Sequence, residues 1–449
     1  MYKSFYKLTR NPFEITPDPS FLFPTKKHNE ALASLYYGVR RHKGFVVLTG
    51  EVGTGKTLLL RCLMQLLKRN DDVAYAYVFN GRLTSAEFLQ YIAADFGLAA
   101  SQKNKSELLL ELSNFVIDRG LKGLTTVLVV DEAHQLSTEI LETVLPASVT
   151  PDQLGRATKG AAVALLAKTY LFHTDLSGHW QLAAQTAEQV EGMGYQLTSL
   201  YYDNFRAATK ANTEEIFTVN HVAGTLGIGN ELNAWFSPRV LNGYGFFWPT
   251  QSLVSNFEVA SGGQVDPRLN YCVAQSGYPY FDTPFDSTWT STGYLTRKMV
   301  QPLSEVPSTT KNVGTVNYEA LRLSDILLID AEALNENGQS AQALAPLNMV
   351  RKRARESYLY DTSLAGYGTV PAGLLPDIAT TDQGQLRDII RRERRSELAL
   401  EFHRFFDVIR YGSAYATAAL SPGTNFNYTT NRFYPIPQSE RDANPNLFK

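Results

Sequence analysis

Two different hydrophobic patterns divide the chain. Up to about residue 142, short apolar runs alternate with segments whose apolar residues recur every three or four positions. The runs predict strands at 45–48, 73–79 and 127–130, and the spaced positions predict helices over 56–68, 85–96 and 106–118. Strands that alternate with helices are typical of an α/β domain with a parallel sheet.

The second pattern, from about residue 143 onward, is mainly helical. Apolar and small residues at helical spacing predict helices over 157–171, 180–190, 317–336, 341–355 and 384–410. The stretch from about 195 to 315 is rich in aromatic and turn residues and has no long period, which indicates loops and short strands.

Two of the later helices should pack on each other. The turn Asn337-Gly338 leaves only a short connection between 317–336 and 341–355, so we expect an antiparallel pair. Its expected seams are Leu321, Leu328, Ala331 and Leu334 on one helix, and Leu344, Leu347, Val350 and Ala354 on the other. Helix 384–410 should bury a stripe of Leu398, Phe402 and Phe405 against the same scaffold.

Composition narrows the possible partners. Of the 449 residues, 44% are hydrophobic and 19% are charged, as in folded globular proteins. The net charge of −2 argues against nucleic acid as a partner. Cys62 and Cys272 lie far apart, so neither a disulfide framework nor a zinc site is expected. No run of about 18 apolar residues predicts a transmembrane helix.

The segment from Gly50 to Thr57 has the sequence GEVGTGKT and matches GxxxxGK[ST] between a predicted strand and a predicted helix. The glycines, Gly50, Gly53 and Gly55, allow backbone N–H groups to surround phosphates at a helix N-terminus. Lys56 would contact the β- and γ-phosphates, and the Thr57 hydroxyl would bind Mg²⁺. The motif therefore predicts binding of ATP with Mg²⁺.

An acidic pair follows the third predicted strand. Asp131 would hold the Mg²⁺, and Glu132 would polarise the attacking water as the catalytic residue. The alternative is that both only cap the following helix, and His134 is better explained as a residue of that helix start.

Residues 1–142 resemble the general secretion pathway protein A (ExeA-type) ATPases of the AAA+ superfamily. The resemblance rests on Asn11-Pro12-Phe13, Pro17-Asp18-Pro19, Phe21-Leu22-Phe23, the segment from Gly44 to Thr57, and Asp131-Glu132-Ala133-His134-Gln135-Leu136-Ser137. It implies ATP hydrolysis in the assembly of secretion or export machinery, with secretion-machinery proteins as partners. The family's sensor strand, fifth strand, arginine finger and helical lid are not recognisable after Ser137. The expected domain is thus a truncated P-loop NTPase with an incomplete parallel sheet, which makes enzymatic activity uncertain.

Residues 143–449 resemble the SusD/RagB family of nutrient-uptake lipoproteins. The clearest matching segments are Gly155 to Ala162, Asp266-Pro267-Arg268, Leu321 to Leu334, Glu393 to Leu398, Arg404 to Arg410 and Tyr434-Pro435-Ile436-Pro437. The resemblance implies a mostly α, TPR-like helical domain with long loops, an oligosaccharide ligand, a TonB-dependent transporter as partner and an outer-membrane location. The first part of the family's fold and its lipobox cysteine are not found, and no signal peptide precedes residue 20, so the chain as written is expected in the cytoplasm.

Aromatic residues of the middle region are candidates for sugar contacts, because sugar rings stack on aromatic planes. The candidates are Trp235, Tyr244, Trp248 and Trp289, and core packing is the alternative for each. The arginine-rich run Arg391-Arg392-Glu393-Arg394-Arg395 is better explained by ion pairs along one helix, with Glu393, Glu397, Glu401 and Asp407, than by nucleic-acid binding.

Two functions from different classes follow: glycan binding for uptake, and a cytoplasmic ATPase of the secretion machinery. They need different compartments. We therefore interpret the chain as a non-physiological fusion, with its join near residues 138–147.

Overall fold

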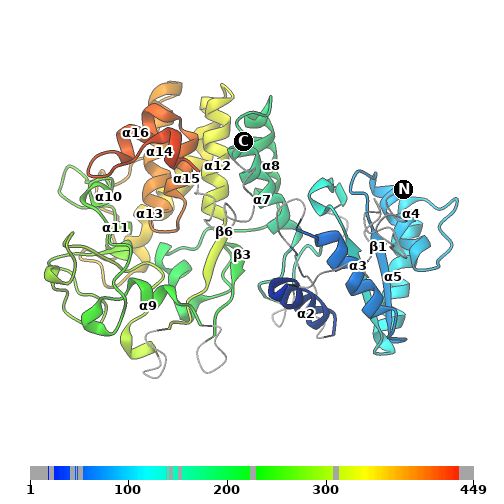
Figure 1. Ribbon diagram of the computed structural model, residues 1–449. Helices are drawn as coiled ribbons and strands as arrows, with labels where there is room; N and C mark the ends of the chain where they lie inside the picture. The colour runs from blue at the N-terminus through cyan, green and yellow to red at the C-terminus, as the bar shows by residue number, and fades with distance from the viewer. Residues whose placement is uncertain are drawn as a thin grey trace, which may run out of the picture. The chain divides into compact units, whose positions relative to one another are not determined.

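The structure is a computed structural model that describes residues 19, 25–40, 46, 48, 54–137, 139–140, 145–149, 154–222, 229–306 and 313–433. The chain divides into two compact units, Met1–Ala162 (unit 1) and Val163–Lys449 (unit 2). Figure 1 shows the elements of both units. No helix in the described ranges is long and apolar enough to cross a bilayer.

Unit 1 has an α/β architecture. Its elements are α2 (Lys26–Arg40), α3 (Lys56–Leu67), β1 (Val73–Val78), α4 (Ser85–Asp95), α5 (Lys105–Leu121) and β2 (Thr125–Val130). The two strands are parallel, in a register that pairs Val73 with Thr125 and Val78 with Val130. These elements confirm the predicted helices and two of the predicted strands. The third predicted strand, 45–48, falls largely outside the described residues.

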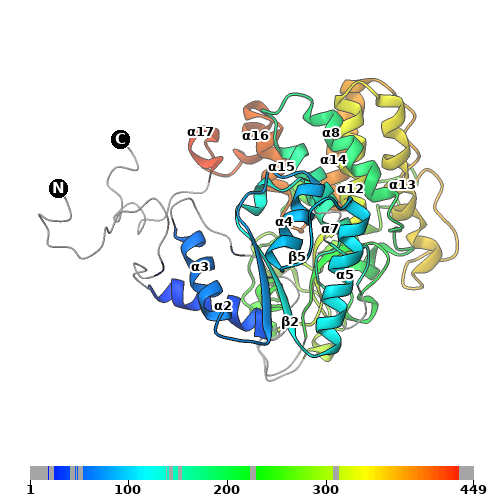
Figure 2. The same ribbon diagram turned by 90° about the vertical axis from the view of Figure 1, so that its right-hand side faces the viewer.

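The strands of unit 1 divide its core into two layers, because successive side chains of a strand point to opposite faces. On one face, Tyr75, Tyr77, Val127 and Val129 pack with Leu35 of α2 and Leu60, Leu63 and Leu67 of α3. On the other, Ala76, Val78, Leu128 and Val130 pack with Phe88 and Ile92 of α4. Figure 2 shows α2 and α3 on one side of the strands and α4 and α5 on the other.

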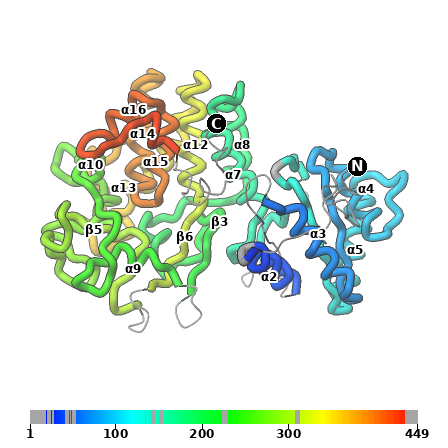
Figure 3. The backbone as a smooth tube through the Cα atoms, viewed as in Figure 1, coloured from blue at the N-terminus to red at the C-terminus, as the bar shows by residue number. Residues whose placement is uncertain are grey.

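Unit 2 is mainly helical. Its longer helices are α8 (His179–Glu191), α12 (Leu323–Glu336), α13 (Ser340–Tyr360) and α14 (Gln383–Glu397), followed by α15 (Arg404–Arg410), α16 (Ser413–Leu420) and α17 (Tyr428–Asn431); α7 (Lys159–Phe172) crosses from unit 1 into unit 2. The central helix is α12, which packs against α8, α13 and α14 (Figure 3). Ala183, Ala184 and Ala187 form the buried face of α8, and such small residues allow close helix approach.

The middle region of unit 2 consists of short elements and loops, as predicted. It contains α9 (Leu232–Phe236), α10 (Gln251–Val254), α11 (Arg268–Cys272) and the antiparallel strands β4 (Val273–Ala274) and β5 (Leu295–Thr296). A second antiparallel pair joins β3 (Glu215–Val219) to β6 (Tyr318–Arg322).

The packing of α12 on α13 confirms the predicted helix pair. The two helices are joined by Asn337–Gln339, in which Gly338 has a φ of +78°, a conformation that glycine adopts without strain. Leu328, Leu347 and Val350 are fully buried. The predicted start of the first helix is wrong, because residues 318–322 form strand β6 and Leu321 lies in that strand.

The predicted single helix 384–410 is also wrong. Helix α14 ends at Glu397 and α15 begins at Arg404. Between them, Leu400 and Phe402 have φ values of 65° and 67°, which an α-helix cannot contain. The break turns the Glu401 carboxylate into the interior, where it pairs with Lys298 and Arg322. Leu398 is buried as predicted, but Phe402 is 43% exposed, so its predicted burial is wrong.

Candidate functional site

The P-loop motif is described from Thr54 onward, while Gly50 and Gly53 lie outside the described residues. Gly55 precedes α3 with a φ of 80°, and Lys56 and Thr57 open the helix as half-buried residues. The backbone carbonyl of Thr54 lies 3.2 Å from Nε2 of His28 on α2. Because glycine tolerates this left-handed φ, the turn into α3 is unstrained, and its first N–H groups point out of the helix end.

Asp131 follows β2 and is buried. Its Oδ2 accepts a hydrogen bond from the Tyr77 hydroxyl at 3.2 Å, and its Oδ1 accepts one from the Glu132 backbone N–H at 3.0 Å. Glu132 has a φ of 51°, so it sits in the left-handed region, with its side chain exposed. Burial and the neighbouring Asp131 raise the pKa of Tyr77 to about 12, so this hydroxyl remains a donor at neutral pH.

Tyr77 connects the acidic pair to the P-loop helix. Its hydroxyl also interacts with Arg61, which lies one turn after Thr57 on α3. A cavity of about 410 Å³ lies beside these residues, lined by Pro19, Arg61, Met64, Gln65, Lys68, Tyr75, Tyr77, Tyr91 and Asp95. None of the predicted nucleotide-binding residues lines it.

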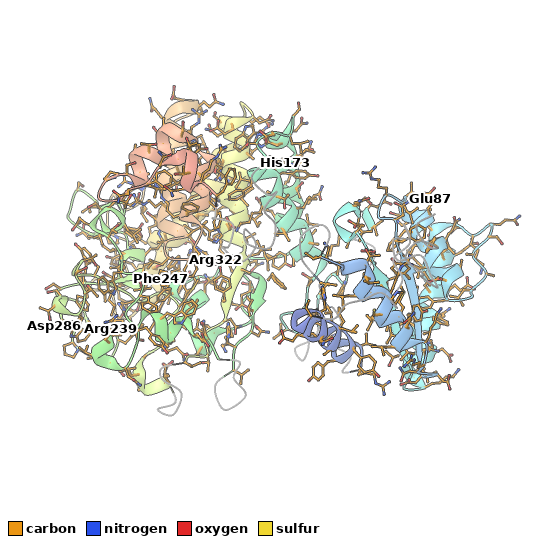
Figure 4. All side chains as sticks on the ribbon, in the orientation of Figure 1. Glu87, His173, Arg239, Phe247, Asp286 and Arg322 are labelled. Atoms are coloured by element: carbon orange, nitrogen blue, oxygen red, sulfur yellow. The ribbon has the colours of Figure 1, made fainter. Side chains whose placement is uncertain are left out.

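A second candidate site is a group of exposed aromatic side chains in unit 2, the aromatic strip, formed by Tyr244, Phe246, Phe247, Trp248 and Phe402. These side chains are between 37% and 56% exposed. The Tyr244 and Phe246 rings stack with centroids 5.6 Å apart, and Phe247 meets Phe402 edge to face at 6.0 Å. Buried Phe236 lies beneath them, 5.9 Å from Phe247 and 6.2 Å from Phe402. Figure 4 labels Phe247 among the side chains of this region.

The loop that carries the strip is folded back onto α9. The N–H groups of Tyr244, Gly245 and Phe246 donate to the carbonyl oxygens of Ala234, Ser237 and Trp235. A Cβ on Gly243 would lie only 2.0 Å from the Ser237 carbonyl oxygen, so only glycine fits this close approach.

Two members of the strip have an unusual backbone. Phe247 has a φ of 58° and Phe402 one of 67°. A bulky residue in this region costs about 1–2 kcal/mol. Such strain is often found at functional sites, and both phenyl rings are exposed here.

The four predicted sugar-contacting residues separate into two groups. Tyr244 and Trp248 are exposed in the strip, and half-buried Trp235 lies 6.4 Å from the Phe247 ring. Trp289 instead packs at 6.3 Å from Tyr280 and 5.7 Å from Phe285, within a core cluster. Phe402 was missed because its place in a helical period favoured burial.

A buried network of charges, the central charge cluster, joins segments of unit 2 that lie far apart in the sequence. Glu397 of α14 pairs with Arg268 at 2.9 Å, Arg322 at 2.6 Å and Arg353, and Arg322 also pairs with Glu214 at 2.9 Å. Figure 4 labels Arg322 inside unit 2. Burial raises the pKa of Glu214, but the Arg353 and Arg322 charges prevail and lower it to about 2.

The predicted ion pairs along helix 384–410 are therefore mostly wrong. Glu393 pairs with Arg268 at 2.5 Å and Arg351 at 2.9 Å, and Glu401 pairs with Lys298 at 2.6 Å. These partners come from other parts of unit 2. Arg394 does pair with Asp407 at 3.4 Å, but across the break between α14 and α15.

Comparison with known proteins supports both resemblances. The model described as "SusD family" matches residues 213–449, and that described as "AAA domain" matches residues 39–173. The chain is 40% identical to General secretion pathway protein A of Aeromonas hydrophila over 143 residues, which are 32% of this chain and 26% of that protein. It is thus a fusion of two parts, an AAA-like part and a SusD-like part.

The C-terminal part has relatives in sequence and in structure. It is 28% identical to SusD-like protein P2 of Formosa agariphila over 321 residues, which are 66% of this chain and 60% of that protein. A solved structure titled "Laminarin binding SusD-like protein" is 27% identical, with a TM-score of 0.50, and the match covers 68% of this chain and 65% of that one. The chain thus spans less than two thirds of the length of these relatives.

Proposed function

The chain belongs to the SusD family, whose model matches more than half of it, and on this premise we propose that residues 143–449 bind an oligosaccharide at the aromatic strip. The main support is the exposure of large aromatic side chains, which proteins usually bury. Tyr244 and Trp248 are 39% and 37% exposed, and strained backbone keeps Phe247 beside them. The laminarin-binding relative supports a glycan as the ligand.

Family membership also supports a cellular role. SusD-family proteins are outer-membrane lipoproteins, so we propose nutrient uptake there, with a TonB-dependent transporter as partner.

Binding is tested by titrating the purified chain with laminarin oligosaccharides and a panel of other glycans. Tyr244→Ala and Trp248→Ala should weaken binding at least tenfold, about 1.4 kcal/mol each. Tyr367→Ala is the matched control, since Tyr367 is a 51% exposed tyrosine outside the strip. Equal affinities for all four proteins, or no binding to any glycan, would contradict the proposal.

For the N-terminal part we propose nucleotide binding without efficient hydrolysis. In this proposal Lys56 contacts the phosphates, Thr57 and Asp131 hold Mg²⁺, and Glu132 orients the attacking water. The left-handed turn at Gly55 and the carboxylate at the end of β2 fit these roles. The ion would supply charge neutralisation for phosphoryl transfer. Hydrolysis should be weak, because no sensor strand or arginine finger is recognisable in the sequence.

A fluorescent ATP analogue should bind to the chain and should lose its affinity in Lys56→Ala. Vigorous Mg²⁺-dependent turnover that Lys56→Ala abolishes would instead support the alternative function, an ATPase acting in secretion or export. We further propose that the AAA-like and SusD-like parts, 1–142 and 143–449, were joined non-physiologically near 138–147. Amplification of this junction from source DNA tests that proposal.

A further inference from the structure

Four arginines on α14 and α15 have no carboxylate partner within the described part of the chain: Arg392, which is exposed, and the three considered next. Arg395 donates to the Ser252 hydroxyl at 2.9 Å, and Arg404 donates to the Tyr415 hydroxyl at 3.3 Å. Arg391 has a buried Nε without a hydrogen-bond partner. All three are half-buried. Neutral hydroxyls do not compensate a guanidinium charge, so three positive charges remain uncompensated here.

Other arginines of the same two helices have their positive charge balanced by carboxylates. Arg394 pairs with Asp325 at 3.0 Å and Asp407 at 3.4 Å. Arg410 pairs with Glu332 at 2.5 Å and Asp407 at 2.9 Å. The three half-buried arginines therefore lie on helices whose more deeply buried arginines, Arg394 and Arg410, do have acidic partners.

Two of the three arginines, Arg391 and Arg404, lie against aromatic rings. The Arg391 guanidinium lies 4.1 Å from the Tyr411 ring centroid and 5.1 Å from that of Tyr415. The Arg404 guanidinium lies 5.6 Å from the same Tyr415 ring. Stacking on aromatic faces restricts these side chains, so they lose little freedom when they bind a ligand.

The arginines also affect one another. Burial, together with the nearby Arg404 charge, lowers the pKa of Arg395 to about 10. An anion between these groups would remove the repulsion that the folded chain otherwise contains.

Short stretches of chain connect two of these arginines to the aromatic strip. Arg404 follows Phe402 by two residues, which limits their Cα separation to about 7 Å. Arg395 is bonded to Ser252, which follows Trp248 by four residues, or at most about 14 Å of chain. An oligosaccharide of several sugar rings is long enough to span separations of this size.

We propose that Arg395 and Arg404, supported by the charge of Arg391, bind the anionic substituent of an acidic glycan, a carboxylate or a sulfate ester, whose sugar rings stack on the aromatic strip. This inference rests on the proposed glycan-binding function and specifies its substrate class. Guanidinium groups form paired, charge-assisted hydrogen bonds with both kinds of oxyanion. The adjoining aromatic rings favour a glycan over a lipid phosphate.

The test uses the full chain and one glycan backbone in three forms: neutral laminarin oligosaccharides, the same oligosaccharides with sulfate esters, and the same with C6 oxidised to carboxylate. The acidic forms should bind at least tenfold more tightly than the neutral form at low salt, and the difference should shrink as salt is added. In the double variant Arg395→Gln/Arg404→Gln this difference should disappear. The control is Arg392→Gln, because Arg392 is an exposed arginine of the same helix that donates to the Asn256 carbonyl oxygen at 3.0 Å.

Stability separates a binding role from a structural one. Loss of uncompensated charges should leave the thermal midpoint of the double variant unchanged or higher, whereas a structural ion pair would give a lower midpoint. If the unmodified chain binds neutral and acidic oligosaccharides with equal affinity, the anion site is overturned, but the proposal that a glycan binds at the aromatic strip is not. If no glycan binds, the proposed function fails, and binding of inorganic sulfate then tests the anion site. The anion site is overturned if sulfate does not bind, or if the double variant still binds it. If the chain binds anionic lipid vesicles but no acidic glycan, the proposal that a glycan occupies the anion site is overturned.

Discussion

The two units differ in where they keep their charged side chains. In unit 1, pairs such as Arg40–Asp72 and Lys122–Asp118 have side chains 43–62% exposed, around an apolar sheet core. In unit 2, Glu214, Arg268, Arg322 and Glu397 pair with side chains at most 1% exposed. Exposed pairs add little stability, whereas a buried charge is costly once its partner is removed. Unit 2 should therefore be far more sensitive to charge changes than unit 1.

The largest expected effect comes from Glu397→Ala. The substitution leaves Arg268, Arg322 and Arg353 buried with one shared partner fewer, which should cost about 3–5 kcal/mol of unit 2 stability. Asp118→Ala, which removes an exposed pair from unit 1, should cost less than about 0.5 kcal/mol. Urea unfolding followed by hydrogen exchange in each unit measures both. Similar losses of stability in the two variants would contradict the difference between the units.

Apolar core substitutions should not distinguish the units in this way. Leu328→Ala in α12 and Leu63→Ala in α3 remove buried side chains, so each should cost about 2–5 kcal/mol. We expect each to shift only the unfolding transition of its own unit, because under the proposed non-physiological join neither unit evolved to cover the other. Calorimetry of the two variants tests this independence, and a shift of both transitions by one substitution would contradict it.

The pH dependence of stability should also differ between the two units, by an amount between the effects above and those below. Burial and Glu188 raise the pKa of Glu191 to about 7, and burial and Glu191 raise that of Asp330 to about 7. A carboxyl with a raised pKa binds more protons in the folded state, so this part of the stability is lost as pH rises from about 4 to about 7. In unit 1 the shifts resolved for carboxyls are in the opposite direction: hydrogen bonds from Thr84 lower the pKa of Glu87, and those from Lys105 and Ser85 lower that of Glu139.

Glu191→Gln should therefore raise the free energy of unfolding of unit 2 by about 1–2 kcal/mol at pH 8, after allowance for solvent screening, and leave it unchanged at pH 4. Glu188→Gln is the control, because Glu188 is exposed and should give a smaller gain. A pH-independent effect of Glu191→Gln would show that the raised pKa is wrong.

The smallest effects concern exposed residues, two of them aromatic. Phe402→Ala removes stacking on Phe236 and Phe247 and should cost about 1 kcal/mol, while weakening glycan binding. Phe79→Ala, an exposed phenylalanine of unit 1, should leave glycan binding unchanged. Arg392→Ala on the exposed face of α14 should barely change the thermal midpoint. Loss of glycan binding in Phe79→Ala would contradict the assignment of the site to the strip.

Local pattern was sufficient to predict much of the fold. Helices α3, α4 and α5, strands β1 and β2, and the α12–α13 pair follow from apolar spacing and from a turn at Asn337-Gly338. The break after Glu397 has no such signal, because Leu400 and Phe402 turn left-handed without glycine or proline. Long-range ion pairs also override the local pattern, since Glu401 is drawn inward by Lys298 and Arg322.

The candidate sites divide in the same way. Fixed motif spacing predicted Lys56, Thr57 and Asp131, and exposure now distinguishes Tyr244 and Trp248 from Trp289. Phe402 and Arg395 depend on contacts between segments more than a hundred residues apart, with Phe236 and Ser252 respectively. Such long-range contacts cannot be read from a single sequence.

In the loop after α9, the path of the backbone does not depend on which aromatic side chains the loop exposes. Gly243 and hydrogen bonds to Ala234, Trp235 and Ser237 fix the path, and none of these bonds uses an aromatic side chain of the strip. Exposed rings such as Tyr244 and Phe246 can thus be exchanged with little effect on folding. During evolution such a loop can acquire a new ligand preference through single substitutions, provided that Gly243 is retained.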